Sequence, residues 1–140
     1  MALNTSASAH PHSRVGGSSA TAYSALKLGF TVAPIVAGLD KFFNVLTDWT
    51  VYVAPTITNL LGVTPSAFMM VVGVIEVIAG ILVAVKPRIG GMVVAAWLGG
   101  IILNLVIHPL HYWDIALRDL GLLIGAFSLS MLAADREREG

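Results

Sequence analysis

One long apolar segment with a single charge constrains this sequence more than any other feature. It runs from Ala67 to Val85, AFMMVVGVIEVIAGILVAV, and its one charged residue, Glu76, lies near the middle. About 20 apolar residues cross a bilayer as a helix, so this segment is long enough to span it. A carboxylate at the centre of such a helix costs roughly 2 to 3.5 kcal/mol on insertion scales. We therefore expect Glu76 to face protein and to have a partner inside a helix bundle.

The composition places the whole chain in the membrane class. Its 140 residues are 56% apolar and 11% charged, whereas soluble domains carry about 25% charged residues. The formal net charge is zero and the basic residues form no patch, so nothing favours nucleic acid as a partner. The chain has no cysteine, which excludes a disulfide, a thiol relay and a thiolate-bound haem or iron-sulfur cluster.

The hydropathy pattern predicts an all-α fold, a polytopic membrane four-helix bundle. We place its spans at residues 22–41, 67–85, 89–107 and 115–133, within a membrane domain at 21–134. The segment between the first two spans is aromatic but interrupted by Pro55 and Gly62, which predicts a short helix lying in the membrane interface. Residues 1–20, with a solvated His10 and His12, form a disordered cytoplasmic tail, and residues 135–140 a charged cytoplasmic tail.

The distribution of Lys and Arg sets the orientation. If both termini are cytoplasmic, the outer side carries only Lys41 and Arg118, and all other basic residues fall inside. The positive-inside rule therefore favours N-in, C-in. Small residues mark the faces on which the spans pack: Glu76 shares its helix face with Gly73, Ala79 and Gly80, and four-residue spacings link Gly91, Ala95 and Gly99 in span three and Gly121 and Gly125 in span four.

In this topology the polar residues of the spans gather in the outer half of the bilayer. Asn104, Arg118 and Asp119 lie within roughly 6 Å of the outer boundary, and Glu76 is about 13 Å deep. We expect Glu76 and Arg118 to be coupled, directly or through Asp119, because opposite charges in an apolar bundle are less costly together than apart. A neutral carboxyl group, a structural ion pair and a proton- or ligand-binding role all remain open for Glu76.

Three further polar residues surround the start of the last span. His108 continues a stripe with Asn104 on span three, His111 follows it, and Asp114 stands where it can cap the fourth helix. The spacing H-x2-H-x2-D is unspecific and no fourth ligand is present, so we predict no metal site. A bis-histidine haem lacks a second histidine within the spans.

Several of these residues occur in a familiar order. Gly38-Leu39-Asp40-Lys41 ends span one, Glu76-Val77 and Ile81-Leu82 lie in span two, and His111-Tyr112-Trp113-Asp114 precedes a final span with a basic residue near its start. This order resembles the DoxX family of small bacterial membrane proteins over about residues 26–132. The resemblance implies a bundle in the bacterial cytoplasmic membrane, and an association with redox systems such as quinone-linked oxidoreductases, including thiosulfate dehydrogenase. Its matching polar positions are Lys41, Glu76, His111, Asp114 and Arg118, while the cysteine pairs of thiol-exchanging relatives are absent.

The first functional hypothesis is an integral membrane subunit of a redox complex, or a partner to one, with a pocket near the outer face for a quinone headgroup or a partner loop. An accessory subunit with a purely structural role is the alternative, and a small transporter is a third reading. No nucleophile–base set or cofactor ligand set is visible, so we expect no enzyme acting alone and no intrinsic cofactor, with lipid and other membrane subunits as partners. The candidate ligand-binding residues are Lys41, Glu76, Asn104, His108, His111, Asp114, Arg118 and Asp119.

Overall fold

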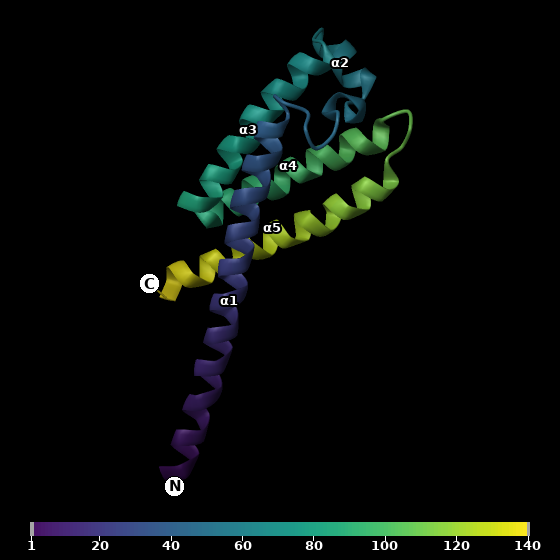
Figure 1. Ribbon diagram of the computed structural model, residues 1–140. Helices are drawn as coiled ribbons and strands as arrows, with labels where there is room; N and C mark the ends of the chain where they lie inside the picture. The colour runs from purple at the N-terminus through teal and green to yellow at the C-terminus, as the bar shows by residue number, and fades with distance from the viewer. Residues whose placement is uncertain (1, 140) are drawn as a thin grey trace.

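The computed structural model describes the backbone of residues 2–139 and the side chains of residues 17–138. Within that backbone the chain is helical and contains no strand (Figure 1). Four helices are long and apolar enough to cross a membrane, which confirms the predicted all-α four-helix membrane bundle. The elements, in chain order, are α1 (Ala2–Asp40), the single 3-10 turn η1 (Trp49–Tyr52), α2 (Pro55–Leu61), α3 (Pro65–Val85), α4 (Pro87–Ile107) and α5 (Trp113–Glu139).

The candidate spans are somewhat longer than the sequence indicated. They cover Gly17–Asp40, Pro65–Val85, Pro87–Ile107 and Trp113–Arg138. At its end, α5 continues into the charged segment, where Arg138 pairs with Asp135 at 3.5 Å and Glu137 pairs with Arg88 at 3.2 Å. Ion pairs of this kind support a last helical turn that hydropathy does not detect. The described backbone of α1 is helical over residues 2–20, where the sequence predicted a disordered tail. The side chains of residues 1–16 lie outside the described part, so the expectation for His10 and His12 stays a prediction.

The long helices pack as two close pairs, α1 with α3 and α4 with α5, and α3 joins the pairs by packing on α4. Glycines permit the closest approaches. A Cβ built on Gly38 would lie 2.5 Å from the carbonyl oxygen of Gly73, and one on Gly91 would lie 2.9 Å from the carbonyl oxygen of Ala126. These positions confirm the small-residue faces predicted for spans two and three. The shared core contains Ala79, Val83, Val94, Ala95, Leu98, Ala126 and Leu129.

The turn between α3 and α4 is a single residue long. Lys86 ends α3 by donating its N–H to the carbonyl oxygen of Leu82, and Pro87 begins α4, where its missing N–H is not needed. Gly90 lets the two helices pass, because a Cβ there would lie 2.5 Å from Cα of Val83. This turn and the end of α5 lie toward the same end of the bundle, and the segment from Lys41 to Thr64 lies at the opposite end (Figure 1).

Residues 41–64 form a cap over that opposite end. The predicted short helix is present, as the seven-residue α2, and it is preceded by η1, whose N-terminus is capped by the side chain of Asp48. Asn104 of α4 fixes the cap: its Nδ2 donates to the carbonyl oxygen of Tyr52 at 2.7 Å, and its Oδ1 accepts from the N–H of Ala54 at 2.9 Å. The cap is thereby held over the space between the long helices.

The glycine crossing gives a first prediction. Replacing Gly73 by Ala should lower the apparent melting temperature of the purified protein, because its Cβ would lie 2.6 Å from the carbonyl oxygen of Gly38 and overpacking costs about 1 to 3 kcal/mol. Gly121→Ala is the matched control, since no atom lies within 4 Å of its Cβ position and alanine favours a helix over glycine. A Gly73→Ala variant as stable as the Gly121→Ala variant would contradict the close crossing.

Candidate functional site

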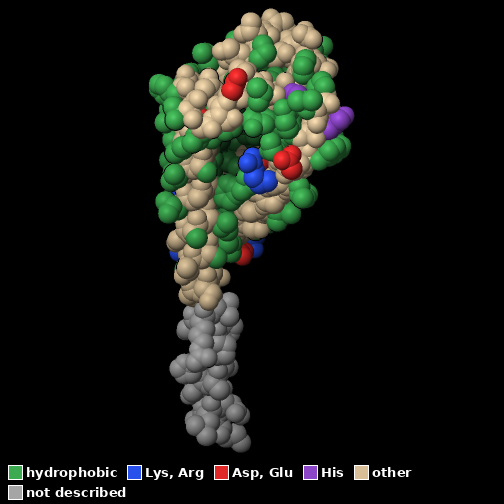
Figure 2. Space-filling model, turned by 45° about the vertical axis from the view of Figure 1, so that its right-hand side comes forward, with side chains coloured by type: hydrophobic (Ala, Val, Ile, Leu, Met, Phe, Trp, Pro, Cys, Tyr) green, Lys and Arg blue, Asp and Glu red, His purple; other side chains and the backbone are tan. Residues whose placement is uncertain are grey.

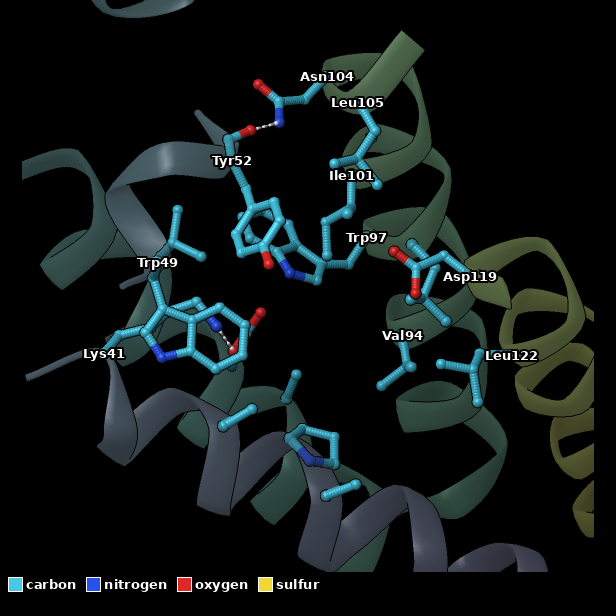
Figure 3. A pocket seen from close by; sticks show the side chains of 18 of the residues that line it. Lys41, Trp49, Tyr52, Val94, Trp97, Ile101, Asn104, Leu105, Asp119 and Leu122 are labelled. Atoms are coloured by element: carbon cyan, nitrogen blue, oxygen red, sulfur yellow. Dashed lines mark hydrogen bonds and ion pairs between the residues drawn. The ribbon is translucent and has the colours of Figure 1, made fainter. Parts of the chain in front are cut away.

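A cavity of about 820 Å³ lies inside the bundle, below the cap (Figure 3). All four long helices and η1 contribute to its wall, which is mostly apolar and aromatic. Five of the eight predicted ligand-binding residues line it, namely Lys41, Glu76, Asn104, Arg118 and Asp119. The cavity therefore collects polar groups that the sequence places in four separate helices.

Glu76 forms a buried ion pair with Lys41. The distance from Lys41 Nζ to Glu76 Oε2 is 2.6 Å, and the two side chains are 4% and 10% exposed. Glycines bring them together, because a Cβ on Gly73 would lie 3.2 Å from Cβ of Lys41, and one on Gly38 would lie 3.1 Å from Cβ of Glu76. The expectation that Glu76 faces protein and has a partner is fulfilled, but the predicted coupling to Arg118 is wrong. The flexible stem of Lys41 reaches inward from the end of α1 and takes that place.

The ammonium group of Lys41 also lies against an aromatic ring. Its Nζ is 3.8 Å from the ring centre of Trp49 in η1, a distance at which cation–π attraction is favourable. The indole Nε1 of Trp49 in turn donates to Asp40 Oδ2 at 2.8 Å. Asp40 also accepts from the backbone N–H groups of Val45 and Leu46, each at 3.0 Å. Asp40 therefore shapes the loop that carries Trp49 over the ion pair.

Sequence reasoning missed Asp40 and Trp49 as parts of the site. Asp40 was visible as the neighbour of Lys41, and Trp49 as one of several interface aromatics. Their roles depend on the loop folding back over the end of α1, and hydropathy contains no signal for that.

A second charged pair lies on the other side of the cavity. Arg118 contacts Asp119 Oδ1 through both Nε and Nη2 at 3.3 Å. The side chain of Arg118 is 66% exposed, whereas that of Asp119 is 6% exposed. Figure 3 shows Asp119 on the wall opposite Lys41, with the rings of Trp49, Tyr52 and Trp97 around the space between them. The guanidinium group thus stands at the rim, and the carboxylate that holds it lies in the wall.

Trp97 contributes a hydrogen-bond donor that is not satisfied. Its indole Nε1 is buried and has no hydrogen-bond partner in the part of the chain that the structure describes. Leaving a buried donor without an acceptor costs about 1 to 3 kcal/mol, so such groups are rare and indicate a missing partner. Trp97 lines the cavity from α4. Sequence reasoning missed it because the third span has no charge to draw attention to it.

The remaining predicted residues shape the turn between α4 and α5. His108 is buried, accepts the N–H of Leu110 at its Nδ1, and packs against the ring of Tyr112 at 4.8 Å. His111 is exposed, adopts a positive φ of 48° and has its Nδ1 2.9 Å from the carbonyl oxygen of Val106. Asp114 is exposed in the first turn of α5, where a carboxylate meets the helix dipole favourably. None of these three residues lines the cavity.

Asn104 lines the cavity, but both ends of its amide are engaged by the cap. We therefore assign it a structural role instead of the predicted ligand-binding one. Among the described residues, no three His, Asp or Glu side chains gather in a way that would hold a metal ion.

The fold and composition define an integral, multi-pass membrane protein with an internal cavity. Comparison with models of known protein families, with curated proteins and with solved structures found no match. The chemistry of the cavity is the remaining guide. Apolar walls with donors on one side and a guanidinium group at the rim suit an apolar ligand that carries acceptor oxygens.

The buried ion pair gives a second prediction. Lys41→Met and Glu76→Leu should each destabilise the protein by about 3 to 5 kcal/mol, because each leaves one buried charge without its partner. The double variant should recover a large part of this loss in thermal or chemical unfolding of the reconstituted protein. The exposed pair of Arg88 and Glu137 is the control, with side chains 55% and 56% exposed, and its coupling should stay below about 1 kcal/mol. A double variant no more stable than the sum of the single losses would contradict the pair.

Proposed function

We propose that this chain is a membrane subunit of a redox complex, or a partner to one, and that it binds a quinone headgroup in the cavity. A DoxX-like identity and a place in the bacterial cytoplasmic membrane, with both termini cytoplasmic, are part of this proposal. The observation that carries it is the pair of polar groups on opposite walls of an otherwise apolar cavity: Lys41 with Glu76 on one side, and Arg118 with Asp119 on the other.

The dimensions and chemistry of the cavity suit this ligand. A volume of about 820 Å³ falls within the range of small-molecule sites. A quinone ring has two carbonyl oxygens that point in opposite directions, and each is stabilised by a hydrogen-bond donor. The ammonium group of Lys41 is a donor on one wall, and the buried indole N–H of Trp97 in α4 is a second donor without a partner among the described residues. The guanidinium group of Arg118 supplies them at the rim.

The aromatic side chains support the same assignment. Trp49, Tyr52, Phe68 and Trp97 all line the cavity, and flat rings of this kind favour an offset-stacked flat ligand. Glu76 is the titratable group next to the donor Lys41. The sequence placed His111 among the candidate ligand-binding residues, but His111 lies outside the cavity wall, and Lys41 is better placed to donate to a ligand.

Tryptophan fluorescence tests this function, because two of the three Trp residues line the cavity and quinones quench indole emission. The protein would be titrated with a quinone in lipid nanodiscs, on a Trp113→Phe background, since Trp113 is 60% exposed and lies outside the wall. We expect saturable quenching. Gly100→Leu should weaken binding by about tenfold, because Gly100 lines the cavity and no atom lies within 4 Å of its Cβ position, so that the new side chain fills ligand space without a clash.

Gly121→Leu is the matched control. Gly121 also has no atom within 4 Å of its Cβ position, but it does not line the cavity. The quinone affinity of the Gly121→Leu variant should therefore equal that of the parent protein. Quenching that does not saturate, or equal affinity in the Gly100→Leu variant, would contradict a quinone site. The chain would then be an accessory subunit whose charges only stabilise the bundle.

A further inference from the structure

We propose that the cavity opens sideways into the bilayer between α1 and α5, and that its ligand enters there head first and leaves a single flexible tail in the opening. This inference rests on the proposed function and narrows its ligand to tailed quinones, such as isoprenoid quinones. We call the opening the lateral gap and define its edges as Ala33, Pro34 and Ala37 on α1 and Ile115, Arg118 and Leu122 on α5.

The two helices are in contact below the cavity, where the guanidinium group of Arg136 in α5 lies 4.7 Å from the ring centre of Tyr23 in α1, and they leave space between this contact and the cap. A Cβ on Gly125 of α5 would lie 3.2 Å from Cζ of Phe30 in α1, so these residues close the lower end of the gap. From there toward the cap, α1 follows α3 and α5 follows α4, and Figure 1 shows α1 and α5 separating in that direction. Trp49 and Tyr52 of the cap close the upper end.

The exposure of the lining residues shows which side of the cavity is open. On α3 the lining residues Met69, Val72, Glu76 and Ala79 are buried and Phe68 is half-buried, and on α4 Gly100 is the one lining residue that is exposed. On the edges of the lateral gap, Ala33 and Leu122 are exposed, and the Arg118 side chain is 66% exposed. A residue that both lines a cavity and meets the outside marks its mouth. Figure 2 shows a hollow among apolar side chains with a basic group at its edge.

The surroundings of the lateral gap determine what can pass through it. The neighbouring outward-facing residues Val32, Val36 and Leu117 are 48%, 50% and 71% exposed, and all belong to candidate spans. Such a surface contacts hydrocarbon, so the mouth admits molecules dissolved in the bilayer. The side chains of Lys41, Glu76 and Asp119, however, line the inside of the cavity, and Arg118 stands at its rim. A ligand that matches both environments has an oxygen-bearing headgroup inside and an apolar chain outside.

Small residues line the α1 edge of the lateral gap. Ala33 and Ala37 lie four residues apart on the same face of α1, and Ala33 is exposed. A linear tail can lie along this face of the helix. Arg118 stands beside the lateral gap, held by the buried carboxylate of Asp119, where it meets the headgroup as it enters.

The test compares a tailed quinone with the same headgroup without its tail, by the fluorescence titration in nanodiscs. Ala33→Phe places a large ring in the lateral gap without adding a tryptophan to the fluorescence signal, and Val36→Phe places the same ring on the lipid-facing side of the same helix as the control. We expect Ala33→Phe to weaken binding of the tailed quinone by about tenfold and that of the tailless one by less than about twofold. Val36→Phe should leave both affinities unchanged.

Each other outcome identifies what is wrong. If the Ala33→Phe variant binds the tailed quinone as tightly as the parent protein, the lateral gap is not the entrance, and the quinone site itself still stands. If the parent protein binds neither quinone, the proposed function fails as well.

A second measurement does not depend on the variant. A quinone with a photoreactive group at the start of its tail should label peptides of α1 and α5 that contain Ala33 and Leu122, and labelling confined to α3 or α4 would overturn the inference.

Discussion

The buried ion pair between Lys41 and Glu76 is the interaction on which the rest of the structure depends. Neither charge is tolerable alone in an apolar bundle, and at 2.6 Å each removes most of the penalty of the other. The pair forms because Gly38 and Gly73 let the backbones of α1 and α3 touch. The cap then completes the pair's surroundings, with Trp49 over the ammonium group and Asp40 holding Trp49 in place. The need to pair Lys41 with Glu76 therefore sets both the crossing of α1 with α3 and the position of the loop that carries Trp49.

The same constraint explains why the bundle contains a cavity. Since α1 is tied to α3 by the glycine crossing and the ion pair, it cannot also lie along α5, which packs on α4. The two helices are in contact from Tyr23 and Arg136 up to Phe30 and Gly125, and the cap closes the volume above that contact. Asn104 makes this closure possible by bonding Tyr52 and Ala54 of the cap. Some polar residues in the spans therefore shape the cavity. Others have hydrogen-bond donors that are still available to a ligand, chiefly Lys41, Trp97 and Arg118.

The proposed quinone site and the lateral gap belong together, because the gap is the proposed entrance to the cavity that holds the headgroup. The headgroup site needs donors on opposite walls, and the apolar surroundings of the mouth require that the molecule carrying the headgroup be soluble in the bilayer. This arrangement would give a redox partner a defined binding site for a quinone dissolved in the membrane. The quinone ring would be enclosed in the cavity, and its tail would remain in the lipid. In this proposal the chain supplies binding and orientation, and the redox partner supplies the electrons.

The sequence by itself determined the four spans, the small-residue faces of spans two and three and the fact that Glu76 faces protein, whereas Gly121 in the expected face of span four has no neighbour within 4 Å of its Cβ position. These follow from hydropathy and helical periodicity, which are properties of neighbouring residues. It did not determine the partner of Glu76, because Lys41 and Arg118 were both within reach and only the α1–α3 crossing decides between them. It placed His108, His111 and Asp114 in the site by their depth, whereas in the fold His108 and His111 lie in the turn before α5 and Asp114 lies in the first turn of α5. The unpaired donor of Trp97 and the gap beside Ala33 were invisible to sequence reasoning, because a missing contact exists only once every helix has its place.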